Sequence, residues 1–132
     1  MKYLLPDGWP RPKGYSNGIS VDAGRTIFIA GLIGWNEKEV IESDKLTDQF
    51  RKTLENIIAV LKVDGAGPEH IVRMTWYITD KREYLDNLKE MGAIYREVIG
   101  KNYPVMACVE VSALMEDRAK IEIETTAIVE EQ

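Results

Sequence analysis

Two segments near the C-terminus, residues 103–111 and 119–124, alternate apolar and polar side chains with a period of two. Such alternation is typical of β-strands that bury one face, so both segments are predicted to be strands. We expect one face of the pair to carry Met106, Cys108, Glu110, Glu122 and Glu124. Sulfur, apolar groups and carboxylates together fit neither a core face nor a plain solvent face. Another copy of the chain is therefore expected to cover it.

Apolar residues recur at helical spacing in residues 44–64, which predicts a helix with one core-facing stripe. The stripe comprises Phe50, Leu54, Ile57, Ile58 and Leu61. Ser43 or Asp44 is expected to cap the start of this helix, and Gly65 to follow its end.

A second helix is predicted from Asp80 to about Ile99, before Gly100. Asp80 and Glu83 have the spacing of a capping box, in which two side chains bond the first backbone N–H groups. Its inward residues are expected to be Leu85, Leu88, Met91, Tyr95 and Val98.

Three further segments are predicted to be strands. Residues 19–21 and 26–33 are expected to form a hairpin around the turn at 22–25, after a proline- and glycine-rich loop over residues 6–18. Residues 71–79 alternate again, with Val72, Met74, Trp76 and Ile78 on one face.

The whole chain, residues 1–132, is therefore expected to form one α+β domain with the element order β-β-α-β-α-β-β. Both helices would cover one face of the sheet and leave the other face bare. To the five residues named above, the prediction adds these to the bare face: Phe28, Leu32, Arg73, Thr75 and Tyr77. A face of this size and composition indicates a homo-oligomer.

Composition narrows the function. The 132 residues carry a net charge of -5, which argues against a surface that tracks nucleic-acid phosphates. Cys108 is the only cysteine, and the sequence contains no apolar run of membrane-spanning length. A cytoplasmic protein that makes no contact with membranes is the simplest expectation.

Few residues have the pattern of a reactive site. His70 has no second histidine or cysteine at ligand spacing, so no metal site is predicted. Cys108 has no neighbouring histidine to ionise it, and a small buried strand residue is the plainer interpretation. Glu122 and Glu124 share a strand face near Glu110, where like charges can raise one another's pKa and favour acid–base catalysis. Interface ion pairs are the alternative for all three carboxylates.

Five segments carry a resemblance to a known family: residues 13–18, 29–33, 72–80, 104–111 and 121–127. Over about residues 13–129 the chain resembles the Rid/YjgF family of reactive-intermediate deaminases, often labelled endoribonuclease L-PSP. The resemblance implies a chorismate-mutase-like α+β fold and a homotrimer with a central barrel and three clefts between subunits. Active members hydrolyse imines or enamines to 2-oxo acids and ammonia without a cofactor.

Matched to the family, Tyr15 is the loop tyrosine, Gly31 a backbone contact and Glu122 the carboxylate that positions water. The family's carboxylate-binding arginine is replaced by Met106. Leu32 and Gly92 also replace polar residues, while Trp35 is expected to add an aromatic surface. The predicted lining is Gly31, Leu32, Trp35, Met106 and Cys108. Arg11, Arg73 or Arg118 could supply a substitute cation.

Three functions remain open: a divergent deaminase for a larger, more apolar imine or enamine, a non-catalytic small-molecule binder, and a ribonuclease. Retention of Glu122 and Tyr15 favours the first, and loss of the arginine favours the second. The third is weakest, because the chain is acidic and has one histidine.

Overall fold

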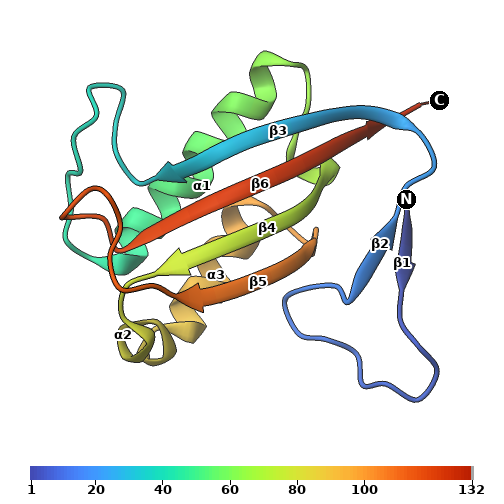
Figure 1. Cartoon of the computed structure of the whole chain (residues 1–132), viewed down its shortest axis with the longest axis horizontal. Coiled ribbons are helices and arrows are strands. Elements are labelled where there is room, and N and C mark those ends of the chain that lie inside the picture. The colour runs from blue at the N-terminus through green and yellow to red at the C-terminus, as the bar shows by residue number, and fades with distance from the viewer. Residues whose placement is uncertain (132) are drawn as a thin grey trace.

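The computed structural model describes residues 1–131 and has a four-stranded sheet in the order β3–β6–β4–β5 (Figure 1). These strands are β3 (Gly24–Ile33), β4 (Ile71–Ile78), β5 (Val105–Glu110) and β6 (Ile121–Glu130). β6 is antiparallel to β3 and β4, whereas β5 runs parallel to β4. The predicted α+β class is confirmed.

Helices α1 (Leu46–Val63) and α3 (Leu88–Val98) lie behind the sheet, so that the opposite face is uncovered within this chain (Figure 1). The short 3₁₀ helix η1 (Pro68–His70) directly precedes β4, and α2 (Lys81–Asp86) follows β4 beside the end of β5 (Figure 1). Within residues 1–131, no helix is both long and apolar enough to cross a bilayer.

The predicted hairpin between residues 19–21 and 26–33 is wrong. The short strand β2 (Gly18–Ser20) pairs instead with β1 (Lys2–Leu4), antiparallel, and the two stand apart from the main sheet (Figure 1). Lys2–Leu4 carries too few residues to show a period, and its partner lies far along the chain. Local patterning therefore gave no sign of this pairing.

The core confirms the apolar stripe of α1. Phe50, Leu54, Ile57 and Leu61 have no solvent exposure, and Ile58 packs at the edge of the same cluster. The helix has no side-chain hydrogen bond at its N-cap, so the expected capping by Ser43 or Asp44 is wrong. Gly65 does follow the helix, with the positive φ of 69° that glycine adopts readily.

The predicted second helix is divided at Asn87 into α2 and α3. Asp80 caps α2 by accepting a hydrogen bond from the Glu83 N–H at 3.1 Å. The capping box is incomplete, because the Glu83 carboxylate pairs with Lys120 Nζ at 2.8 Å instead. Met91 and Tyr95 face the core as predicted, but Leu85 and Leu88 are exposed. The break at Asn87 separates the apolar positions of α2 from those of α3.

The register between β4 and β5 corrects the predicted sheet face. Met106 is paired with Met74 and Cys108 with Trp76, so both side chains point toward the helices. Both pack against the main core. Glu110 is likewise paired with Ile78, and its carboxylate accepts a 2.7 Å hydrogen bond from the first N–H of α2, that of Lys81.

Leu32 is also on the helix side. A β-bulge between Ile29 and Leu32 shifts the register, so that Leu32 is paired with the core residue Ile123. The uncovered face keeps Phe28, Arg73, Thr75, Tyr77, Glu122 and Glu124, and β5 adds Val105, Ala107 and Val109 in place of the expected sulfur residues.

Gln49 of α1 is 2% exposed, and it connects the helix to the loop that precedes α1 and to the loop that precedes β6. Its Nε2 donates to the carbonyls of Ser43 and Arg118 at 2.9 and 3.0 Å. Its Oε1 accepts from the Lys120 N–H at 2.8 Å. Three partly buried backbone groups thus depend on one side chain.

Gln49→Leu should lower the free energy of unfolding by about 2–4 kcal/mol, because these backbone groups would lose their partners without gaining water. Urea denaturation followed by circular dichroism measures the change. Glu55→Leu, at an exposed position of the same helix, is the control and should change stability by less than about 0.5 kcal/mol. Equal effects of the two substitutions would contradict this account of Gln49.

Candidate active site

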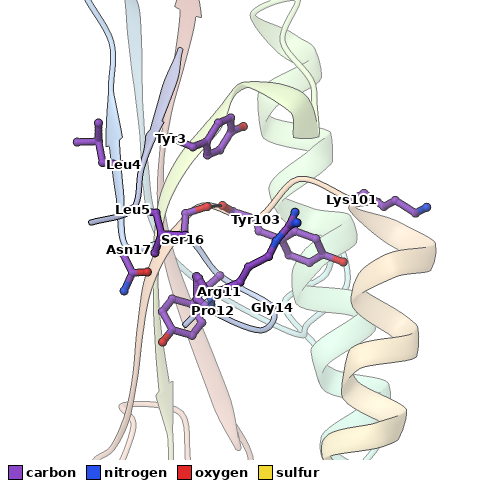
Figure 2. Close-up of a pocket in the computed structure, with 11 residues that line it drawn as sticks. Tyr3, Leu4, Leu5, Arg11, Pro12, Gly14, Ser16, Asn17, Lys101 and Tyr103 are labelled. Atoms are coloured by element: carbon purple, nitrogen blue, oxygen red, sulfur yellow. Dashed lines mark hydrogen bonds between the residues drawn. The ribbon is translucent and has the colours of Figure 1, made fainter. Parts of the chain in front are cut away.

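The loop before β2 is held against the start of β5 by Ser16. The Ser16 N–H donates to the Pro104 carbonyl at 3.0 Å, and its hydroxyl donates to the Tyr103 carbonyl at 2.5 Å (Figure 2). A parallel bridge also joins Ser16 to Val105. These bonds place Tyr15 beside Tyr103 and Met106, with its ring partly exposed.

A cavity of about 400 Å³ opens between this loop, β5 and α3. Aromatic and apolar side chains form most of its wall: Tyr15, Trp76, Tyr84, Leu88, Met91, Tyr95, Tyr103 and Met106. Within the described part of the chain, Lys13 and Arg96 are the only charged residues in the lining. We call this space the inner cavity. Its composition fits an apolar ligand with an anionic group.

A second cavity of about 560 Å³ lies under the N-terminal segment (Figure 2). It shares Gly14, Tyr15 and Tyr103 with the inner cavity, so the two adjoin. Arg11 and Lys101 are its charged residues. We call this space the outer cavity.

Glu122 lies elsewhere, on the uncovered face of β6. It is half-buried, and its carboxylate has no hydrogen-bond or ion-pair partner among residues 1–131. Gly31 makes room for it, because a Cβ at position 31 would overlap Glu122 Oε2. Gly31 and Glu122, which were both expected in the site, are therefore neighbours in the structure, and their roles stay predictions.

Trp35 does not line the cavity beside Met106. It packs against Ile33, Ile41 and Ala119, beyond the end of β3. Ile33 is in register with Glu122, so Trp35 belongs to the Glu122 end of the sheet.

The predicted site residues thus fall into two groups. Tyr15, Met106 and Cys108 lie near β5, whereas Gly31 and Glu122 lie across β3 and β6. Because β4 lies between β5 and β6, these two strands are about 10 Å apart across the sheet. Tyr77 of β4 is paired with both Glu122 and Val109, so Glu122 lies at the level of Val109. Val109 is three residues from Met106, which is about 10 Å along β5. Their side chains also point to opposite faces, so one small molecule cannot touch both in one chain.

Cys108 has the environment of a structural thiol. Burial raises the pKa of Cys108, against the opposing effect of its hydrogen bond with Tyr84. Burial likewise raises the pKa of Tyr84 to about 12. Both groups are therefore neutral near pH 7, which fits a packing role for Cys108 better than nucleophilic attack.

The three arginines expected as substitute cations do not line the inner cavity. Arg118 is engaged by Asp44 Oδ1 at 2.9 Å and by the Ile41 carbonyl, and Arg73 is exposed on β4. Arg11 reaches only the outer cavity. Arg96, which the sequence analysis did not consider, lines the inner cavity and lies over Gly92. Its position four residues after Gly92 is the signal that helical spacing could have offered.

No group of three or more histidine, cysteine or acidic side chains within residues 1–131 is arranged to hold a metal ion.

Comparison with known proteins identifies the class. The sequence pattern of the family described as Endoribonuclease L-PSP matches residues 10–129. A RutC family protein of Pyrococcus horikoshii is 37% identical over 127 residues, which cover 94% of each chain. The crystal structure of the Rid family protein YyfB from Yersinia pestis superposes with a TM-score of 0.85 at 28% identity, over 97% of this chain and 98% of that one.

A third relative, Escherichia coli TdcF, is named as a candidate reactive intermediate deaminase. It is 31% identical over 111 residues, 82% of each chain. Its crystal structure with bound serine superposes with a TM-score of 0.68 over 98% of this chain and 99% of that one. The chain therefore belongs to the Rid/YjgF family, also named RutC or L-PSP, and its fold is the YjgF form of the chorismate-mutase-like fold.

Cys108 should react with iodoacetamide more slowly than N-acetylcysteine at pH 7.5, because burial holds its pKa above that of a free thiol and limits access. The rate should rise with pH through a midpoint above that of the free thiol. Mass spectrometry of the intact protein over time measures both. A rate faster than the free thiol would identify a reactive thiolate and contradict this assignment.

Proposed function

We propose that this protein is a divergent deaminase that hydrolyses an imine or enamine of a small organic acid in clefts between copies of the chain. Glu122 would position the attacking water, and Tyr15 would close the cleft from a neighbouring copy. The observation that carries the proposal is the unpartnered, half-buried carboxylate of Glu122 above the opening left by Gly31. The named activity of the TdcF relative supports it.

The reaction would use water, the substrate and the Glu122 carboxylate. The water oxygen attacks the imine carbon while Glu122 accepts one of its protons and delivers it to the imine nitrogen, giving a carbinolamine. Glu122 then accepts the proton of the new hydroxyl group and passes it to the nitrogen. The carbon–nitrogen bond breaks, the carbonyl of the 2-oxo acid forms, ammonia leaves, and Glu122 is again a carboxylate.

A homotrimer would bring the two groups of site residues together. The uncovered sheet face carries Phe28, which is 81% exposed, and Val109, which is 42% exposed. Apolar exposure of this kind on a sheet face favours burial against another copy. Packing of these faces into a central barrel would set Glu122 of one copy beside the Tyr15 loop of the next.

Met106 favours a second candidate, a trimer that binds a small molecule without converting it. A methionine offers no charged fork to hold a carboxylate, so an ancestral substrate would be poorly anchored. The serine-bound structure of the TdcF relative shows that an amino acid can occupy that protein, and the same class of ligand fits this alternative. Ribonuclease activity fits least, since His70 Nδ1 accepts a hydrogen bond from the Gly67 N–H and is structural.

Glu122→Gln should lower the rate of ammonia release from freshly generated 2-imino acids by on the order of a hundredfold or more, because the amide cannot accept the proton. Coupled assays with glutamate dehydrogenase measure the rate. Glu124→Gln is the matched control, one strand position along the same face, where the carboxylate is already bonded by Tyr77 at 3.0 Å. It should retain most of the activity.

Gly31→Ala should also lower turnover, because its methyl group would displace the Glu122 carboxylate without disturbing the fold. Wild-type protein that releases no ammonia from small or bulky imino acids would contradict the deaminase proposal and favour the binder. Equal losses in Glu122→Gln and Glu124→Gln would contradict the role of Glu122.

A further inference from the structure

We infer that the inner cavity selects an aromatic carboxylic acid, with Arg96 holding the carboxylate and the aromatic wall holding the ring. The inference rests on the proposed function in that it names the substrate class of that site. It assigns to a helix residue the anchoring role that Met106 cannot perform from β5.

Charge distribution is the first observation. The protein has a net charge of -5, yet among the described residues 1–131 the two adjoining cavities are lined by four cations and no carboxylate. These cations are Arg11, Lys13, Arg96 and Lys101. None of them has a salt bridge or side-chain hydrogen bond with any of residues 1–131. Unpaired cations gathered around a cavity favour an anionic ligand.

Lys13 and Arg96 both line the inner cavity, and Arg96 is the one with a guanidinium. Its guanidinium lies over Gly92, because a Cβ at position 92 would be 3.3 Å from Arg96 Nη1. Gly92 itself lines the inner cavity, so the absence of a side chain there lets the guanidinium reach the opening. A guanidinium can bind a carboxylate through two parallel hydrogen bonds, which a lysine cannot do.

The wall suits a flat ring. Trp76 packs edge-on against Tyr84 with centroids 6.5 Å apart, and Tyr95 stacks on Tyr103 at 5.9 Å. The Tyr95 hydroxyl is already used, since it donates to the Asn102 carbonyl at 2.5 Å. Met106 adds a polarizable side chain where an arginine would place a charge. Aromatic rings favour such surroundings through both burial and ring–ring contact.

Three related probes separate the charge from the ring: 3-phenylpropanoate carries both, propanoate only the charge, and 3-phenylpropanamide only the ring. Ligand-observed NMR titration of the full chain gives their dissociation constants. 3-Phenylpropanoate should bind about tenfold more tightly than either of the other two probes. Propanoate lacks the buried ring, and 3-phenylpropanamide lacks the charge-assisted hydrogen bond.

Arg96→Ala should abolish the preference for the acid over the amide and leave the amide affinity within about twofold. Arg96→Lys should recover part of that preference. Arg82→Ala, which removes an exposed arginine of α2 that lines neither cavity, is the matched control and should leave the preference within about twofold. An unchanged preference in Arg96→Ala, an equal loss in Arg82→Ala, or equal binding of propanoate and 3-phenylpropanoate would overturn the inference.

These measurements need no turnover, so the two proposals can fail separately. Arg96-dependent binding of 3-phenylpropanoate by a protein that releases no ammonia would retain this ligand class and reject the deaminase. Turnover of small imino acids that depends on Glu122 but is indifferent to Arg96→Ala would retain the deaminase and reject this inference.

Discussion

The structure depends on one constraint, namely which side chains of β5 and β6 face the helices and which face the uncovered side of the sheet. Because successive side chains alternate between the two faces, pairing Met106 with Met74 commits it to the helix side, and pairing Glu122 with Tyr77 commits it to the opposite side. A shift of one residue in either strand would reverse these assignments and expose the core. The same register that buries the core therefore keeps the two groups of site residues apart within one chain.

The cavity beside Met106 follows from this arrangement. Its wall is continuous with the core through Trp76, which also packs against Phe50 with ring centroids 4.8 Å apart. A binding surface built on core aromatic residues is rigid, which limits the entropy lost on binding. Specificity can then change through residues at the rim, such as Arg96 on α3, without rearrangement of the sheet.

Much of the fold could be predicted from the sequence, because α1, β4 and β6 each have a strong period and one buried face. β5 shows where such prediction stops: Val105, Ala107 and Val109 are as apolar as Met106 and Cys108, so alternation gives a strand but not which face is buried. The register with β4, a contact far along the chain, decides that. The β1–β2 pair and the approach of Arg96 to the cavity across Gly92 likewise depend on three-dimensional contacts. The expectation that Glu122 and Gly31 share a site came from the family resemblance, and their contact across β3 and β6 agrees with that expectation, while their roles stay predictions.

The central claim is that one active site is shared by two copies, with Glu122 and Tyr15 supplied by different chains. Mixing two inactive variants, Glu122→Gln and Tyr15→Ala, tests it most directly after denaturation and refolding together, with ammonia release as the measurement. Shared sites predict that mixed assemblies regain activity, because some interfaces combine two intact groups, while each variant refolded alone stays inactive. Mixed assemblies confirmed by native mass spectrometry that remain inactive would contradict the claim.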